Sequence, residues 1–195
     1  ANGIWLCTRL RETDCEVVRY QTAGDDQSKI ADEIREAWKE ADLILTTGGV
    51  SVGEKDLLPG VIENLTGNVL FHGIQVKPGM PTMLSVVKGT PVLSLSGNPF
   101  AVEALFEVLA GGYLTDMEAS RYLQKNQMKI LKQTFVKTGK MKRIVKGRCD
   151  ESGVYLPQIQ KNGQLKNGIG SNCLVIFPEG ERTYAEGEAV RVIRI

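Results

Sequence analysis

The chain has 195 residues, of which 42% are hydrophobic and 24% are charged, and its 24 basic and 23 acidic residues give a formal net charge of +1. So balanced a composition produces only a weak long-range field, which argues against nucleic acid as a partner and means that a charged ligand must be recognised by local groups. No apolar run approaches the roughly 18 residues of a membrane span, which argues against a membrane partner. The length allows one or two domains.

The four cysteines, Cys7, Cys15, Cys149 and Cys173, show no C-x-x-C spacing, and the chain has a single histidine, His72. Zinc sites need closely spaced sets of Cys and His ligands, so no zinc site can be assembled here. The sequence therefore predicts free thiols in a reducing compartment. Because the start of the chain has no signal-peptide pattern, we expect a cytoplasmic protein. His72 has no recognisable acidic or nucleophilic partner, which favours a structural role.

The first residues predict a helix, because Ile4, Leu6, Cys7 and Leu10 recur at helix-like spacing. The chain lacks an initiator methionine and begins almost directly on this helix. We therefore expect further sequence before Ala1.

From residue 15 onward, candidate strands and helices alternate. The candidate strands are 15–20, 42–46, 82–87 and 91–95, with a further extended segment at 68–75. The candidate helices are 27–40 with Asp25 or Asp26 as cap, 57–65 with Asp56 as cap, and 98–110 with Asn98 as cap and Pro99 in its first turn. This alternation predicts an α/β domain with a mostly parallel sheet and helices on both faces. Right-handed crossovers would bring the loops at 25, 47–56, 77–81 and 96–99 to the carboxyl edge of that sheet, where α/β proteins usually bind ligands.

Beyond residue 110 the pattern changes to short β-like runs separated by turn signals. Gly111-Gly112 and the polar stretch 118–127 indicate a boundary, which predicts two domains, residues 1–120 and residues 121–195. The β-like runs are 129–135, 144–149, 154–159, 173–177 and 189–195. We interpret them as a small β-barrel-like domain or open sheet, marginal alone by its size. Its basic residues are typical of a solvated strand face, or they help to hold an anionic substrate across a subunit interface: Lys140, Lys142, Arg143, Lys146 and Arg148.

The segment from Thr46 to Asp56 is the most informative part of the chain, because a glycine loop joins a buried-looking strand to a helix. Glycines let backbone N–H groups approach an oxyanion, hydroxyls add donors, and a helix N-terminus adds partial positive charge. The residues suited to this task are Thr46, Thr47, Gly48, Gly49, Ser51 and Gly53. Asp56 cannot favour an anion by itself, which suggests that it holds a bridging cation such as Mg²⁺. The alternative is a tight turn followed by a helix cap.

Three other positions are also ambiguous. Residues 96–98 precede a second helix start, so they form either a second anion nest or a plain cap. Lys77 lies in a loop bracketed by Pro78 and Gly79, where its ammonium meets an oxyanion or is simply exposed. Asp25 belongs to an acidic pair that either caps a helix or lies near a cation, since like charges so close are easier to explain with a cation nearby.

Three of these segments resemble motifs of the molybdopterin molybdenumtransferases, the family of MoeA and the gephyrin E domain. Residues 46–56, Thr-Thr-Gly-Gly-Val-Ser-Val-Gly-Glu-Lys-Asp, resemble its Gly-Gly-Val-Ser-Val-Gly-(Asp/Glu)-x-Asp signature. Residues 77–81, Lys-Pro-Gly-Met-Pro, resemble Lys-Pro-Gly-Lys-Pro, and residues 95–99, Leu-Ser-Gly-Asn-Pro, resemble Leu-Pro-Gly-Asn-Pro. The resemblance covers residues 1–120 and, more loosely, the remaining chain, where residues 174–180 look like the family's small C-terminal domain.

The resemblance implies an enzyme of molybdenum cofactor biosynthesis that binds adenylylated molybdopterin, places molybdate onto the dithiolene sulfurs and releases AMP with Mg²⁺. It implies Asp56, Asp25 and Lys77 as catalytic residues, with the two carboxylates holding the metal and the lysine holding an oxyanion. The implied substrate-binding residues are Thr47, Gly48, Gly49, Ser51, Gly53, Pro78, Gly79, Ser96, Gly97, Asn98 and Pro99. It also implies a molybdopterin-binding fold similar to the MogA-type domain, a homodimer, and a first sheet strand just upstream of Ala1.

Two residues depart from the family pattern. Met80 stands where the family usually has a second lysine, which removes one cation from the expected molybdate site, and Ser96 replaces a proline. Two other functions stay open: a non-catalytic binding or scaffold module like gephyrin's, which a long apolar groove would favour, and another enzyme of the same fold, such as molybdopterin adenylyltransferase or a competence-damage pyrophosphatase. The glycine loop of those enzymes usually has Thr-Gly where this chain has Val50-Ser51.

Overall fold

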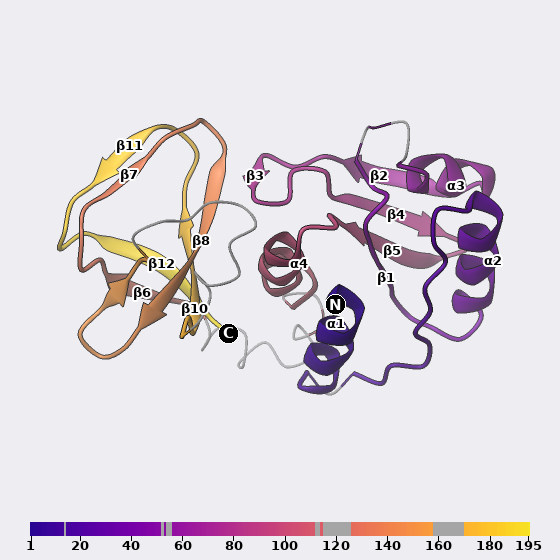
Figure 1. Ribbon diagram of the computed structural model, residues 1–195, viewed down its shortest axis with the longest axis horizontal. Coiled ribbons are helices and arrows are strands. Elements are labelled where there is room, and N and C mark those ends of the chain that lie inside the picture. The colour runs from indigo at the N-terminus through magenta and orange to yellow at the C-terminus, as the bar shows by residue number, and fades with distance from the viewer. Residues whose placement is uncertain (14, 52, 54–55, 112–113, 115–125, 158–169) are drawn as a thin grey trace. The chain divides into compact units, whose positions relative to one another are not determined.

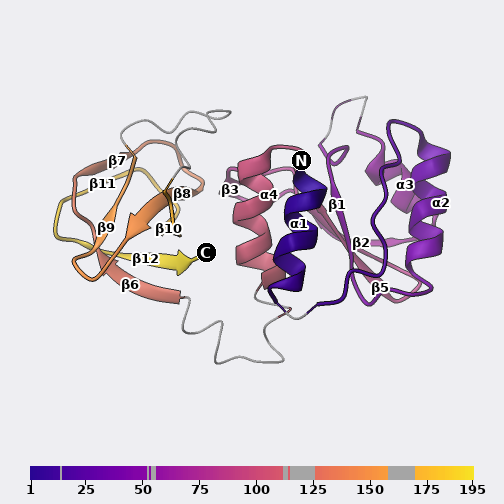
Figure 2. The same cartoon turned by 60° about the horizontal axis from the view of Figure 1, so that its bottom comes forward.

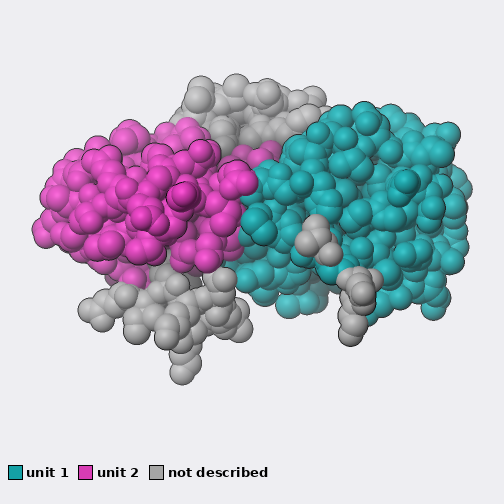
Figure 3. Space-filling model, turned by 90° about the horizontal axis from the view of Figure 1, so that it is seen from above, with its two compact units in different colours: residues 1–74, 79–106 teal, residues 75–78, 107–195 magenta. Residues whose placement is uncertain are grey.

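A computed structural model describes residues 1–13, 15–51, 53, 56–111, 114, 126–157 and 170–195 of the chain. They form two compact units, coloured separately in Figure 3: residues 1–74 with 79–106, and residues 75–78 with 107–195. Most residues near the predicted domain boundary lie outside the described ranges, so a boundary between residues 120 and 121 stays a prediction. Every helix in the described ranges is too short or too polar to be a transmembrane segment.

The first unit is built on a four-stranded sheet with the order β1-β5-β4-β2 (Figure 1). Its strands are β1 (Ile44–Thr47), β2 (Asn68–His72), β4 (Met83–Val87) and β5 (Thr90–Leu95). β1 and β5 run parallel, whereas the β5–β4 and β4–β2 pairs are antiparallel. The prediction of a mostly parallel sheet is therefore wrong for the described strands.

The tight turn between β4 and β5 explains this difference. Lys88 and Gly89 have φ angles of 52° and 90°, and positive φ at both central residues is the geometry of a two-residue hairpin turn. Such a turn joins antiparallel neighbours, while parallel strands need a crossover of a dozen or more residues. The antiparallel pairing of β4 with β5 thus follows from two residues of local backbone.

Helices cover both faces of this sheet, as predicted (Figure 2). They are α1 (Asn2–Arg11), α2 (Gln27–Ala37), α3 (Leu58–Asn64) and α4 (Pro99–Leu105), the last continued by a π-helical turn, η1 (Phe106–Ala110). α2 and α3 pack on one face, where Ile62 joins Met83 and Val92 in a single apolar core. α1 and α4 lie on the other face, where the rings of Trp5 and Phe106 meet edge to face at a centroid distance of 5.7 Å.

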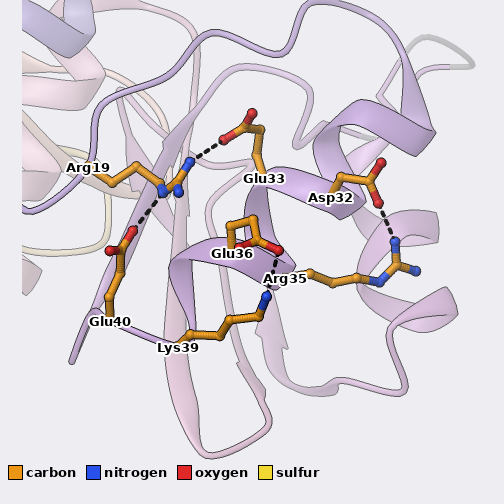
Figure 4. A network of polar contacts seen from close by, with 7 residues as sticks. All are labelled: Arg19, Asp32, Glu33, Arg35, Glu36, Lys39 and Glu40. Carbon is orange, nitrogen blue, oxygen red and sulfur yellow. Dashed lines mark hydrogen bonds and ion pairs between the residues drawn. The ribbon is translucent and has the colours of Figure 1, made fainter.

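The segment 15–20 is not a strand, contrary to prediction. Its backbone pairs with no strand in the described part of the chain, and Val18 is 47% exposed. Arg19 instead fastens the segment beside α2, because its guanidinium donates to Glu33 and Glu40 at 3.1 and 2.7 Å (Figure 4). An alternating pattern favours a strand only where a neighbouring strand is present to pair with its backbone groups.

The second unit contains a sheet with the order β3-β8-β10-β12-β6, with β9 paired to β8, and a separate two-stranded sheet of β11 and β7. The strands are β3 (Val76–Lys77), β6 (Asn126–Ile130), β7 (Phe135–Lys137), β8 (Lys142–Cys149), β9 (Val154–Tyr155), β10 (Cys173–Phe177), β11 (Arg182–Tyr184) and β12 (Ala189–Arg194). The predicted runs find counterparts in β6, β8, β9, β10 and β12. Three other short strands, β3, β7 and β11, were missed or merged, because two or three residues are too few to show a period.

The core of the second unit has an aromatic centre. Phe177 on β10 stacks on Phe135 at 4.5 Å and meets Tyr184 edge-on at 4.7 Å between ring centroids. The main ladder ends at β3 and β6, and beyond it a single bridge joins Leu131 to Val154. One bridge is not a continuous ladder, so the predicted barrel-like closure is not confirmed.

Candidate functional site

The glycine turn begins where β1 ends. Gly48 and Gly49 have φ angles of 86° and 64°, a region that residues with a side chain rarely adopt. A Cβ atom at either position would meet no atom within 4 Å. The two glycines are therefore required for their backbone conformation, and the space that a side chain would fill at either position is open.

Contacts from other segments hold this turn in place. The N–H of Gly48 donates to the carbonyl of Leu95 at 3.0 Å. His72 Nε2 lies 2.7 Å from the carbonyl oxygen of Val50, a residue that is only 1% exposed. Because a carbonyl can only accept, Nε2 must carry the proton here. His72 thus braces the loop, which fits the structural role predicted for it.

Asp56 closes the glycine loop and does not cap the following helix, so the predicted cap is wrong. Its Oδ2 accepts a hydrogen bond from the N–H of Gly53 at 3.0 Å. α3 has Leu57 at its N-cap position without a side-chain cap bond, and Pro59 lies in its first turn as predicted. The carboxylate thus accepts the N–H of a residue three positions earlier in the loop, and not an N–H of α3. Val52, Glu54 and Lys55 lie outside the described residues.

Of the two aspartates before α2, Asp26 is the cap. Its Oδ1 accepts two backbone N–H groups of the first turn at 2.9 and 3.2 Å, whereas Asp25 makes no cap bond and is exposed. α2 begins beside α3, since a Cβ atom on Gly60 would lie 3.9 Å from Gln27 Nε2. Asp25 and Asp56 therefore precede neighbouring helix starts. In the described ranges no group of three or more His, Cys, Asp or Glu side chains could hold a metal.

A second turn, residues 96–98, lies directly against the glycine turn. β1 and β5 are parallel, with Thr47 opposite Leu95, so both turns leave the same edge of the sheet. A Cβ atom on Gly97 would lie 3.6 Å from Gly48 Cα. The structure thus brings two of the three predicted motifs together.

Side chains fix the backbone of this second turn. Asn98 caps α4 through its Oδ1, with Pro99 in the first turn, as predicted. Ser96 Oγ accepts the N–H of Asn98 at 3.3 Å. Asn2 donates from Nδ2 to the carbonyl of Gly97 at 3.0 Å, across 95 residues of sequence. Sequence reasoning missed Asn2, because no local pattern signals so distant a contact.

The third motif, residues 77–81, is divided between the two units. Lys77 lies on β3 in the second unit, and its peptide bond to Pro78 is cis. Gly79 lies in the first unit with a φ of 105°, and a Cβ atom there would come within 2.2 Å of Leu105 Cδ1, so glycine is required. Neither unit alone brings Lys77 to the glycine turns, and its role stays a prediction.

Thr46 does not add a donor to the site, contrary to prediction. Its Oγ1 is buried and has no hydrogen-bond partner in the described part of the chain, and the same holds for Ser94, directly opposite on β5. Thr46 shares its face of the sheet with Ile44, which belongs to the core under α2 and α3. Thr47, one residue on, points to the other face.

In the second unit, burial disfavours the charged form of one thiol and of one guanidinium. All four cysteines are free thiols, as predicted. Burial, and next the neighbouring thiol of Cys149, raises the pKa of Cys173, so little thiolate forms at neutral pH. Burial also lowers the pKa of Arg143 on β8. Arg143 is therefore not simply part of a solvated strand face.

Comparison with known proteins agrees with this geometry. A family profile described as "Probable molybdopterin binding domain" matches residues 1–116. The chain belongs to this family. Molybdopterin molybdenumtransferases from Staphylococcus aureus and Staphylococcus epidermidis are 28% and 26% identical to it over 99% of its length. A crystal structure of a molybdopterin biosynthesis MoeA protein from Pyrococcus horikoshii, 28% identical, matches 100% of the chain with a TM-score of 0.82.

The chain spans 47% of the length of each of these relatives. The resemblance predicted from the three motifs is confirmed, as is a mixed α/β fold of the molybdopterin-binding kind. The two turns that meet at the edge of the sheet both lie within the matched residues 1–116.

Proposed function

We propose that the chain is part of a molybdopterin molybdenumtransferase, which inserts molybdate into adenylylated molybdopterin and releases AMP in a Mg²⁺-dependent reaction. The observation that carries this proposal is the contact between the turns at residues 47–49 and 96–98 in a molybdopterin-binding domain. Relatives with this name match 99% of the chain, which supports the same activity here.

The backbone of the two turns suits substrates that carry oxyanions. No atom lies within 4 Å of where a Cβ atom would stand on Gly48 or Gly49, so a ligand can approach the turn closely. The N–H of Gly48 is taken by Leu95, so the N–H groups that follow it in the turn would form the anion-binding concavity. The hydroxyls of Thr47 and Ser51 would add donors at the same loop. Lys77 would add a cation, since both molybdate and the adenylyl phosphate are negatively charged.

The carboxylates beside the loop fit a hydrated Mg²⁺, which usually keeps several waters and takes one or two carboxylates plus substrate phosphates. Asp56 and Asp25 would hold it: Asp56 Oδ2 is bonded to Gly53, Oδ1 receives no hydrogen bond from the described residues, and Asp25 is exposed. When bound, Mg²⁺ would polarise the phosphoanhydride and neutralise charge in the transition state.

Molybdate-dependent release of AMP tests the proposal. The chain, and the longest natural form of the protein that contains it, are incubated with adenylylated molybdopterin, molybdate and Mg²⁺, and AMP is measured by chromatography. We expect AMP release to require both molybdate and Mg²⁺, with sulfate in place of molybdate as the matched control. No release from the long form, or release that is independent of molybdate, would contradict the proposal.

We also infer that the enzyme works as a homodimer in the cytoplasm. Four free thiols support a reducing compartment, since disulfides are rare in the reducing cytosol. The dimer is supported by two exposed apolar residues on the edge strand β2, Val69 and Leu70.

A further inference from the structure

The peptide group between Gly97 and Asn98 is held at both of its ends. Its carbonyl accepts the Asn2 amide at 3.0 Å, and its N–H donates to Ser96 Oγ at 3.3 Å. Glycine has no side chain to resist rotation, so a peptide that follows it can flip easily. A flip would exchange the directions of the carbonyl and the N–H. This turn is close to the glycine turn, since a Cβ atom built on Gly97 would lie 3.6 Å from Gly48 Cα.

Asn2 itself is held firmly enough to act as such an anchor. It begins α1, and the edge-to-face contact of Trp5 with Phe106 packs α1 against η1, the continuation of α4. Tyr20 covers the next residue, since a Cβ atom on Gly3 would come within 2.3 Å of its ring. The amide of Asn2 therefore joins the first residue of α1 to the turn that precedes α4.

We propose that Asn2 is a positioning residue for the anion site: it occupies the Gly97 carbonyl and keeps the peptide between Gly97 and Asn98 in the orientation that an anionic substrate needs. This inference rests on the proposed function. A carbonyl released from Asn2 could turn its negative end toward the bound oxyanion, which would repel the substrate. Ser96 helps from the other end, where a serine hydroxyl takes up a backbone N–H that a proline ring could not.

Two variants separate this role from helix stability. Asn2→Asp keeps the shape but loses the donor, and a carboxylate in the first turn of a helix favours the helix. Asn2→Ala loses the donor without adding charge. In both variants we expect the N–H groups of Asn98 and Gly48 to exchange with solvent about three to ten times faster by NMR, as for one lost hydrogen bond. Thr8→Ala is the control, since the Thr8 hydroxyl donates to the carbonyl of Ile4 within the same helix and not to the turn.

Calorimetry with AMP then connects the turn to the ligand. We expect affinity for AMP to fall about tenfold in Asn2→Asp and less in Asn2→Ala, with melting temperature unchanged in Asn2→Asp and partial rescue in Asn2→Gln. Exchange rates that stay unchanged in both variants would overturn the proposal, as would unchanged AMP affinity in Asn2→Asp. If the longest natural form of the protein does not bind AMP, the proposed function fails, and the exchange rates alone decide whether Asn2 positions the turn.

Discussion

At the scale of single residues, Asp56 offers the sharpest test of a metal site. Asparagine at this position keeps an oxygen that can accept the N–H of Gly53, but it loses the negative charge that Mg²⁺ requires. We expect Asp56→Asn to change the free energy of unfolding by less than about 1 kcal/mol. We also expect it to lower Mg²⁺-dependent AMP release by at least about a hundredfold in the longest natural form of the protein, measured by chromatography.

Asp26→Asn is the matched control for this experiment. Asp26 caps α2 through its Oδ1, and asparagine is an equally good cap, so both stability and AMP release should stay near wild type. If Asp56→Asn keeps near-normal turnover with the same Mg²⁺ requirement, Asp56 only closes the loop.

Met80 tests whether the loop at residues 77–81 faces the anion. Its side chain is 50% exposed, so a lysine can replace it without disturbing the core. Met80→Lys should strengthen molybdate binding by about 1 kcal/mol if a partly exposed charge pair forms. Calorimetry on both proteins decides, with Met128→Lys as control, because Met128 is 63% exposed on β6. Equal molybdate affinities of the wild type and Met80→Lys would show that the loop at residues 77–81 does not face the anion.

At the scale of elements, the sequence predicts what local residues determine. The helix starts at Asp26 and Asn98 were predictable because a cap is a contact within three residues, and both caps are confirmed. The glycine turn after β1 was predictable for the same reason. The cap predicted at Asp56 is wrong because its carboxylate can accept an N–H either from the helix after it or from the loop before it. The sequence does not decide between the two, and in the folded loop the partner is Gly53.

Pairing between distant segments was not predictable in the same way. Residues 15–20 have the pattern of a strand, but pairing depends on a neighbouring edge, which periodicity does not reveal. The bond from Asn2 to Gly97 joins residues 95 positions apart. The contact between the two turns was predictable only through the carboxyl-edge rule, which held because β1 and β5 are parallel.

In the hairpin between β4 and β5, the backbone of Lys88 has a strained conformation, and this strain can be tested. A φ of 52° is unfavourable for lysine, whereas asparagine tolerates this region and Asn-Gly is the preferred pair for such a turn. Lys88→Asn should raise the free energy of unfolding of the first unit by about 0.5 to 1 kcal/mol, measured by urea denaturation. Lys88→Ala, which removes the same long side chain without this tolerance, should give no gain. Equal effects of the two variants would contradict this explanation.

The buried hydroxyls between β1 and β5 give a second test at this scale. Thr46 Oγ1 has no partner among the described residues, and an unsatisfied buried hydroxyl costs roughly 1 to 3 kcal/mol. Thr46→Val has nearly the same shape and should therefore leave stability unchanged or raise it by about 1 kcal/mol in urea denaturation. AMP affinity should not change, because this side chain faces the α2 and α3 core. A loss of stability would show that the hydroxyl has a partner such as a buried water.

At the scale of the whole molecule, the chain links its two units twice. Residues 75–78 leave the first unit, supply β3 to the sheet of the second, and return, while the second connection follows Phe106. A cut after residue 106 would therefore leave β3 without its partner β8. The two units have separate cores but cannot be separated by one cut. A change of sequence pattern along the chain indicates the division after the first unit, but it does not reveal that residues 75–78 belong to the second unit.

The last prediction concerns association between copies of the chain. β2 lies at the edge of its sheet, and Val69 and Leu70 on it are 43% and 54% exposed. Its pairing with β4 is irregular between Val69 and Phe71. Exposed apolar side chains on an edge strand with free backbone groups are typical of an interface. We expect sedimentation velocity to show a homodimer at micromolar concentrations of the chain.

Leu70→Lys places a charge at this edge and should shift the equilibrium toward monomer, because burying an unpaired ammonium in an interface is costly. Val136→Lys is the matched control, since Val136 is 62% exposed on β7 in the other unit. A dimer that survives Leu70→Lys would place the interface elsewhere. A wild-type chain that sediments only as monomer would contradict the homodimer itself, while leaving the test of AMP release independent, because the two turns of the candidate site lie within one copy of the first unit.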